Sequence, residues 1–150
     1  MRSGMNFTRP ISKLLDEVKK AYIEDQESKG IRASGKSAKS IKKHVKPTEG
    51  TLTGAKYFFQ QRHGRRPGKF PSVTDILNWI KVKGITPRDS GTSIKSLAFL
   101  FARKIAEKGT DVYLGKRPGL NPDAKVEASV TAMGVAIGKE LKKHFKTTIA

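Results

Sequence analysis

Residues 93–108, SIKSLAFLFARKIAEK, are the stretch of sequence that decides the fold. Apolar residues recur here every three or four positions, which is the spacing of one face of an α-helix. They are Ile94, Leu97, Ala98, Phe101, Ala102 and Ile105. Phe99 and Leu100 widen the apolar face, so we expect burial on more than one side. Gly109 suits a helix end, and the pattern predicts a helix over 93–108.

A second amphipathic helix precedes this one, between Ser72 and Gly84. Ser72 is a good N-cap residue, and Asp75 follows three residues later, close to a capping-box arrangement. The apolar face comprises Val73, Ile76, Leu77 and Ile80, with Trp79 beside it. Across the two helices we expect a common core that includes Trp79, Phe99, Phe101 and Ile105.

Upstream of Ser72 the pattern changes to short strands and turns. A strand is predicted from Ser40, with Ile41 and Val45 on one face and Lys43 sharing that face. A turn at residues 48–50 leads to a second predicted strand over 51–55.

An aromatic cluster, Tyr57-Phe58-Phe59, follows the predicted strands in a short helix or strand that ends at Gly64. Such rings can stack on single-stranded bases, but we expect them to belong to the core. The next segment, residues 65–71, contains two prolines and a glycine and is predicted to be a loop.

The two ends of the chain are predicted to be helical. Pro10 opens a helix that ends near Gly30 and has an apolar stripe. Asn121-Pro122 resembles an N-cap followed by the first helical residue. The last helix has apolar residues at helical spacing: Val126, Val130, Met133, Ile137, Leu141 and Phe145.

These elements predict an α+β fold, with a small antiparallel sheet flanked by about four helices, including an N-terminal and a long C-terminal helix. Its 150 residues fit one domain. We expect residues 1–9 to form a flexible arm and residues 10–150 a single α+β domain.

Positive charge is the most unusual feature of the composition. The chain has 31 Lys and Arg residues against 13 Asp and Glu, a formal net charge of +18. Between Ser28 and Thr74 there are twelve cations and one acid, Glu49, so this segment carries +11 of the excess. A charge of this size favours binding to anionic partners.

The basic segment has two interpretations. It is either a solvated face that protects a sheet edge from aggregation, or a surface that contacts nucleic-acid phosphates or an acidic protein. Sequence-specific DNA reading is not expected, because no helix-turn-helix, zinc-finger or basic-zipper pattern is present. The candidate contact residues are Lys36, Lys39, Lys42, Lys43, Lys46, Arg62, Arg65, Arg66 and Lys69.

Catalytic and metal-binding patterns are weak. Residues 30–37, GIRASGKS, match the phosphate-loop pattern formally, but no buried strand precedes Gly30. His44, His63 and His144 are scattered, and the acidic pairs Asp16/Glu17 and Glu24/Asp25 are expected to be solvated. The absence of cysteine excludes thiolate zinc sites and cysteine nucleophiles. We therefore expect no enzyme, no metal and no cofactor, and a soluble protein made in the cytoplasm.

Residues 57–85, YFFQQRHGRRPGKFPSVTDILNWIKVKGI, and residues 96–110, SLAFLFARKIAEKGT, resemble a family of tailed-phage and prophage proteins. These proteins are described as tail-completion, neck or head–tail joining components. The similar elements are the aromatic stretch closing on His63-Gly64, the loop 66–71, and the helical patterns around Trp79 and Ala102. Many members have an acidic residue where this chain has His63.

The resemblance implies a virion structural protein, located in the tail or neck and synthesised in the host cytoplasm. It implies a homo-oligomeric ring of six or twelve subunits between the portal and the tail, with an α+β fold. Its partners would be adjacent portal, connector or tail proteins, and also packaged DNA, which it would contact through the phosphates. No membrane contact is expected. The alternative from the residues is a stand-alone, non-sequence-specific nucleic-acid-binding protein.

Overall fold

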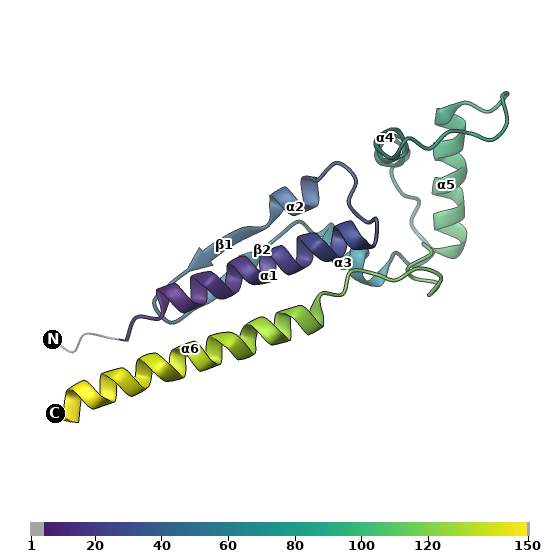
Figure 1. Ribbon diagram of the computed structural model, residues 1–150. Helices are drawn as coiled ribbons and strands as arrows, with labels where there is room; N and C mark the ends of the chain where they lie inside the picture. Colours follow the sequence, from purple (N-terminus) through teal and green to yellow (C-terminus); the bar gives the residue numbers. More distant parts are fainter. Residues whose placement is uncertain (1–4, 150) are drawn as a thin grey trace.

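The N-terminal and C-terminal helices lie side by side and antiparallel in the computed structural model, which describes residues 5–149 (Figure 1). They are α1 (Thr8–Ser28) and α6 (Asp123–Ile149). A two-stranded antiparallel sheet, β1 (Lys42–Val45) and β2 (Gly50–Thr53), lies along α1 on the side away from α6 (Figure 1). These elements form the α1–α6 body of the protein.

Two further helices stand at the far end of this body (Figure 1). They are α4 (Val73–Lys83) and α5 (Ile94–Lys108), and they pack on each other. Two short helices complete the fold: α2 (Lys36–Ser40) lies between α1 and β1, and α3 (Tyr57–His63) lies between β2 and α4. The α+β class, the small antiparallel sheet and the two terminal helices match the sequence prediction.

The core of the body is the apolar stripe of α1. Ile11, Leu15, Val18 and Ala21 are buried there and recur every three or four residues. The start of β2 approaches this stripe closely, because a Cβ at Gly50 would overlap Ile11 and Leu15. Helix α1 begins at Thr8, two residues before the predicted start at Pro10. Residues 1–4 of the expected arm lie outside the described residues.

The sheet has the predicted faces but different bounds. In the β1–β2 register Lys43 is opposite Leu52 and Lys42 is opposite Thr53. Lys43 points toward α1, as its shared face with Val45 predicts, because its ammonium contacts Asp16 and Ser12 of that helix. Residues 36–40 are helical, so the strand predicted from Ser40 begins only at Lys42.

The helices α4 and α5 begin and end where local chemistry predicts. The hydroxyl of Ser72 accepts a hydrogen bond from Asp75 N, and that of Ser93 accepts one from Ser96 N. Such caps satisfy backbone donors that lack a partner in the first turn. Gly84 closes α4 in the left-handed region, with φ +64°.

The α4–α5 core is smaller than predicted. Ile80, Ala98 and Ala102 are completely buried between the two helices. The expected core residues Trp79 and Phe99 are instead 41% and 51% exposed, and the two others, Phe101 and Ile105, are half-buried. The second side of α5 that we expected to be buried is open, because no other element of the described chain packs extensively against it.

A buried polar cluster joins three elements. Gln26 of α1 is fully buried, and its side-chain amide donates to Gln61 Oε1 of α3 at 3.0 Å. Ser37 of α2 donates its hydroxyl to Gln26 Oε1 at 3.2 Å. Because buried polar groups without partners are costly, this closed cluster fixes α2 and α3 against α1.

No helix of the described residues is long and apolar enough to cross a membrane.

Candidate functional site

The candidate basic residues lie on two segments. Five are on α2, on β1 or directly after β1, namely Lys36, Lys39, Lys42, Lys43 and Lys46. Four are on α3 and the loop that follows it, namely Arg62, Arg65, Arg66 and Lys69. Several of them have partners within the chain, so the set is less uniform than the sequence indicates.

Internal partners occupy two of the β1-segment lysines. Lys43 Nζ lies 2.7 Å from Asp16 Oδ1, and Lys46 Nζ lies 3.2 Å from Glu49 Oε2. Within the described part of the chain, Lys36, Lys39 and Lys42 have no such partner, and all three are exposed. The free charge of this segment is therefore on α2 and the first residue of β1.

Arg62 connects two elements of the fold. Its Nη1 and Nη2 donate to Asp123 Oδ1 and Oδ2 at 2.8 and 2.6 Å, a bidentate pair between α3 and the first turn of α6. The hydrogen bond from Arg62 lowers the pKa of Asp123, and the same pair raises the pKa of Arg62. Arg62 thus has a structural role that its place in the basic segment does not indicate.

The acidic pair Glu24/Asp25, which we expected to be solvated, anchors the chain before and within α6. Asp25 is mostly buried, and its Oδ2 accepts from Asn121 N at 2.7 Å and from Lys29 Nζ at 2.9 Å. Glu24 Oε2 lies 2.7 Å from Lys125 Nζ, and the hydrogen bond from Lys125 lowers the pKa of Glu24. The prediction of solvation was wrong for Asp25, because its partner Asn121 is far away in sequence, whereas the Glu24 side chain remains partly exposed.

Acid should weaken this anchoring. A carboxyl group whose pKa is lowered by folding contributes stability above its unfolded-state value and loses it as the pH falls through the lowered value. For Glu24 and Asp123 the ordinary values are 4.5 and 3.8. We expect the thermal midpoint to fall as the pH decreases from about 5 to about 2, and to fall less in a Glu24→Gln/Asp123→Asn variant.

The measurement is thermal unfolding by circular dichroism across this pH range. Glu107→Gln is the control, because Glu107 is exposed and is paired only within α5. A double variant with the same acid dependence as the parent chain would contradict the assignment.

The loop between α3 and α4 is held tightly against the end of α5. Arg65 N donates to Thr110 Oγ1, and Thr110 N donates to Arg65 O, both at 2.9 Å. Gly68 N donates to Ala106 O at 2.9 Å. Residues 65–68 and 106–110 are therefore joined by hydrogen bonds, with donors in each of the two segments.

Two glycines permit this close approach. Gly64 has φ +73° and ψ −174°, and Gly109 has φ +83° and ψ −176°, a backbone region that is essentially restricted to glycine. A Cβ at Gly64 would overlap the backbone of Tyr113 and lie 2.7 Å from Thr110 Oγ1. A Cβ at Gly109 would lie 2.7 Å from Arg65 O. We call this pair the glycine joint.

A groove of about 830 Å³ lies beside the glycine joint. We call it the aromatic–basic groove. It is lined by α3, the loop 64–69 and Tyr113. Phe59 is 68% exposed and lines the groove, so the prediction of an aromatic core is wrong for this residue. Phe58 alone turns inward, with its ring edge-on to Tyr22 at 6.0 Å.

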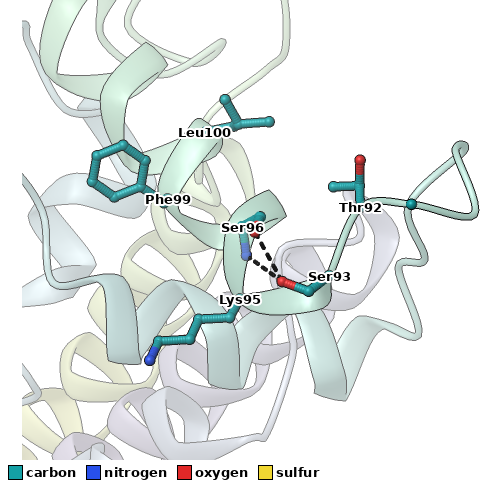
Figure 2. A pocket seen from close by; sticks show the side chains of 7 residues that line it. Thr92, Ser93, Lys95, Ser96, Phe99 and Leu100 are labelled. Carbon is teal, nitrogen blue, oxygen red and sulfur yellow. Dashed lines mark hydrogen bonds between the residues drawn. The ribbon is translucent and has the colours of Figure 1, made fainter.

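A second hollow, of about 480 Å³, lies at the start of α5 (Figure 2). Figure 2 shows the hydroxyl of Ser93 directed at Ser96, where it caps the helix. Phe99 and Leu100 line the same hollow and are largely exposed. The Ser93 and Ser96 hydroxyls are already hydrogen-bonded to each other. Thr92 and Lys95 also line the hollow, so it is an open surface with both polar and apolar side chains and a helix cap at its edge.

Besides Met5, Tyr57, Phe59, Tyr113 and Leu114, large apolar side chains are exposed on three helices and one loop. On α4, α5 and the preceding loop they are Phe70, Trp79, Val82, Ile94, Phe99 and Leu100, and on α6 they are Val130, Val135 and Phe145. We call these residues the exposed apolar surface. The first six lie at the α4–α5 end of the molecule and the last three on α6, so they belong to two separate parts of the structure (Figure 1). Exposed apolar side chains of this kind are typical of sites of protein association.

No group of three or more histidine, aspartate or glutamate side chains suited to a metal ion occurs in the part of the chain that the structure describes. Comparison with protein-family models, with curated proteins and with solved structures found no match to this chain.

Proposed function

We propose that this chain is a structural subunit of a tailed-bacteriophage virion, in the neck or tail-completion ring that joins the head portal to the tail. The observation that carries this proposal is the exposed apolar surface on α4, α5 and α6. A ring of subunits in heterologous contact covers such surfaces, since each subunit presents two different faces to its neighbours. The resemblance of residues 57–85 and 96–110 to phage neck proteins supports the same assignment.

The charge of the chain fits this location. Exposed cations of α2 and β1, namely Lys36, Lys39 and Lys42, would face the DNA channel or an acidic neighbouring ring. Phosphates and acidic side chains there would reduce the repulsion between subunits of +18. The partners are other copies of this chain in a ring of six or twelve, and adjacent portal, connector or tail proteins. The role requires neither catalysis nor a cofactor.

Mass spectrometry of purified virions tests the location, and native mass spectrometry of the purified protein tests the ring. We expect to detect the protein in purified virions and to find the purified protein as an oligomer in solution. Phe99→Gln/Leu100→Gln should shift the oligomer to monomer, because both side chains are exposed in the single chain. The control is Lys104→Gln/Lys108→Gln, two exposed positions in the same helix. Absence from virions, or an oligomer unaffected by the apolar variant, would refute this assignment.

The alternative is a stand-alone protein that binds nucleic acid without sequence preference. The free lysines of α2 and β1 favour it, because cations without internal partners remain available for phosphates. A protein that is absent from particles, stays monomeric and binds duplex DNA with strong salt dependence would support this alternative over the ring.

A further inference from the structure

The walls of the aromatic–basic groove are fixed before any ligand binds. Hydrogen bonds join Arg65 to Thr110 and Gly68 to Ala106, and the two glycines of the glycine joint allow the chain segments to lie in close contact. The guanidinium Nη2 of Arg65 donates to Lys69 O at 2.8 Å, which also restrains the loop. A preformed groove loses little conformational entropy when a ligand enters it.

Two aromatic rings line the groove from different parts of the chain. Phe59 projects from α3 and is 68% exposed, and Tyr113, which follows α5, is 50% exposed. The Phe59 ring centroid lies 4.6 Å from that of His63, also in the lining, at 44° between the planes. Exposed ring surface of this kind is available for stacking with a flat ligand.

The charge of the groove has one sign. Arg66 and Lys69 line it, are exposed, and have no ion-pair partner among the described residues, while no carboxylate lines it. Arg65 adds a third cation at the same loop. The ligand should therefore be anionic.

The combination of rings and cations selects the class of anion. A cationic groove with exposed aromatic side chains is the usual arrangement for single-stranded nucleic acid, whose bases stack on the rings while its phosphates meet Lys and Arg. In a duplex the faces of the bases are covered by their neighbours, so the rings of Phe59 and Tyr113 would have no stacking partner. The groove volume, about 830 Å³, lies in the range of sites for drug-sized ligands, which accommodates a nucleotide.

We propose that the aromatic–basic groove binds single-stranded nucleic acid without sequence preference, with bases stacked on Phe59 and Tyr113 and phosphates held by Arg66 and Lys69. This site is separate from the ring contacts proposed above and does not depend on them.

The test is fluorescence anisotropy with a labelled oligothymidylate of about 16 nucleotides and a duplex of the same length. Phe59→Ala and Tyr113→Ala should each weaken oligothymidylate binding by about tenfold, the loss of one stacked base, and leave duplex binding unchanged. Arg66→Gln/Lys69→Gln should reduce the slope of log affinity against log salt by about 1.4, the loss of two phosphate contacts. Circular dichroism checks that each variant is folded.

Tyr57→Ala is the matched control, an exposed ring on α3 outside both the groove lining and the exposed apolar surface, and it should bind oligothymidylate like the parent chain. The proposal would be overturned if the Phe59→Ala and Tyr113→Ala variants bound oligothymidylate with the same affinity as the parent protein. The proposal would also be overturned if the protein bound poly-glutamate but not oligothymidylate, and if this binding required Phe59. The groove would then hold an acidic protein segment. Neither result bears on whether the protein is part of a virion ring.

Discussion

Replacing Gly64 with alanine will lower the free energy of unfolding by about 2–4 kcal/mol, through backbone strain and overlap together. At φ +73° and ψ −174°, alanine would be in a backbone conformation that only glycine adopts without strain. The added methyl would also overlap the Tyr113 backbone and lie 2.7 Å from Thr110 Oγ1. The atoms of Thr110 and Tyr113 cannot move away easily, because hydrogen bonds hold Thr110 to Arg65.

Urea unfolding of the two proteins measures this effect. Gly134→Ala is the control, because a Cβ at Gly134 meets nothing within 4 Å and the position is inside α6. That variant should gain up to about 1 kcal/mol from the higher helix propensity of alanine. If the Gly64→Ala protein were as stable as the parent, the close contact described between Gly64 and the Thr110–Tyr113 segment would be contradicted.

Ile80→Ala will destabilise the protein by about 2–5 kcal/mol, because it removes most of a fully buried side chain between α4 and α5. The other fully buried residues at this contact are Ala98 and Ala102, which are too small to expand into the space left. The cavity should therefore persist. Loss of this side chain also weakens support for the neighbouring Trp79–Phe101 pair, whose ring centroids lie 6.3 Å apart.

Two variants define the size of this effect. Ile80→Val should cost about 0.5–1.5 kcal/mol, and Val82→Ala should change stability by less than about 0.5 kcal/mol because Val82 is 53% exposed. Denaturant unfolding measures all three. Equal costs for Ile80→Ala and Val82→Ala would contradict the burial described for α4.

The ends of α4 and α5 could be predicted from the sequence because their chemistry is local. Ser72 and Gly84 act on backbone groups within one turn of their own position, so a short stretch of sequence contains all the necessary information. The apolar spacing of α1, α5 and α6 is similarly a property of one helix at a time. The α+β class follows from these elements and the two short strands.

The exposure of Phe99 and Trp79 could not be predicted in this way. Helical spacing shows which residues share a face, but the partner of that face is decided by the rest of the chain. Asp25 and Gln26 were missed for the same reason, since their partners Asn121 and Gln61 are far away in sequence. The pairing of Arg62 with Asp123 also could not be predicted, because it depends on where α6 begins.

The antiparallel contact of α1 with α6 (Figure 1) determines the order in which the chain can fold during synthesis. The α4–α5 pair joins residues 73–108, so its contacts close a short loop and can form early. Helix α1 meets the β1–β2 hairpin early as well, but the anchors of α6 on Glu24 and Asp25 must wait for Asn121 and Lys125 to leave the ribosome. Helix α1 therefore packs on the hairpin first, and its contact with α6 forms last, when α6 has left the ribosome.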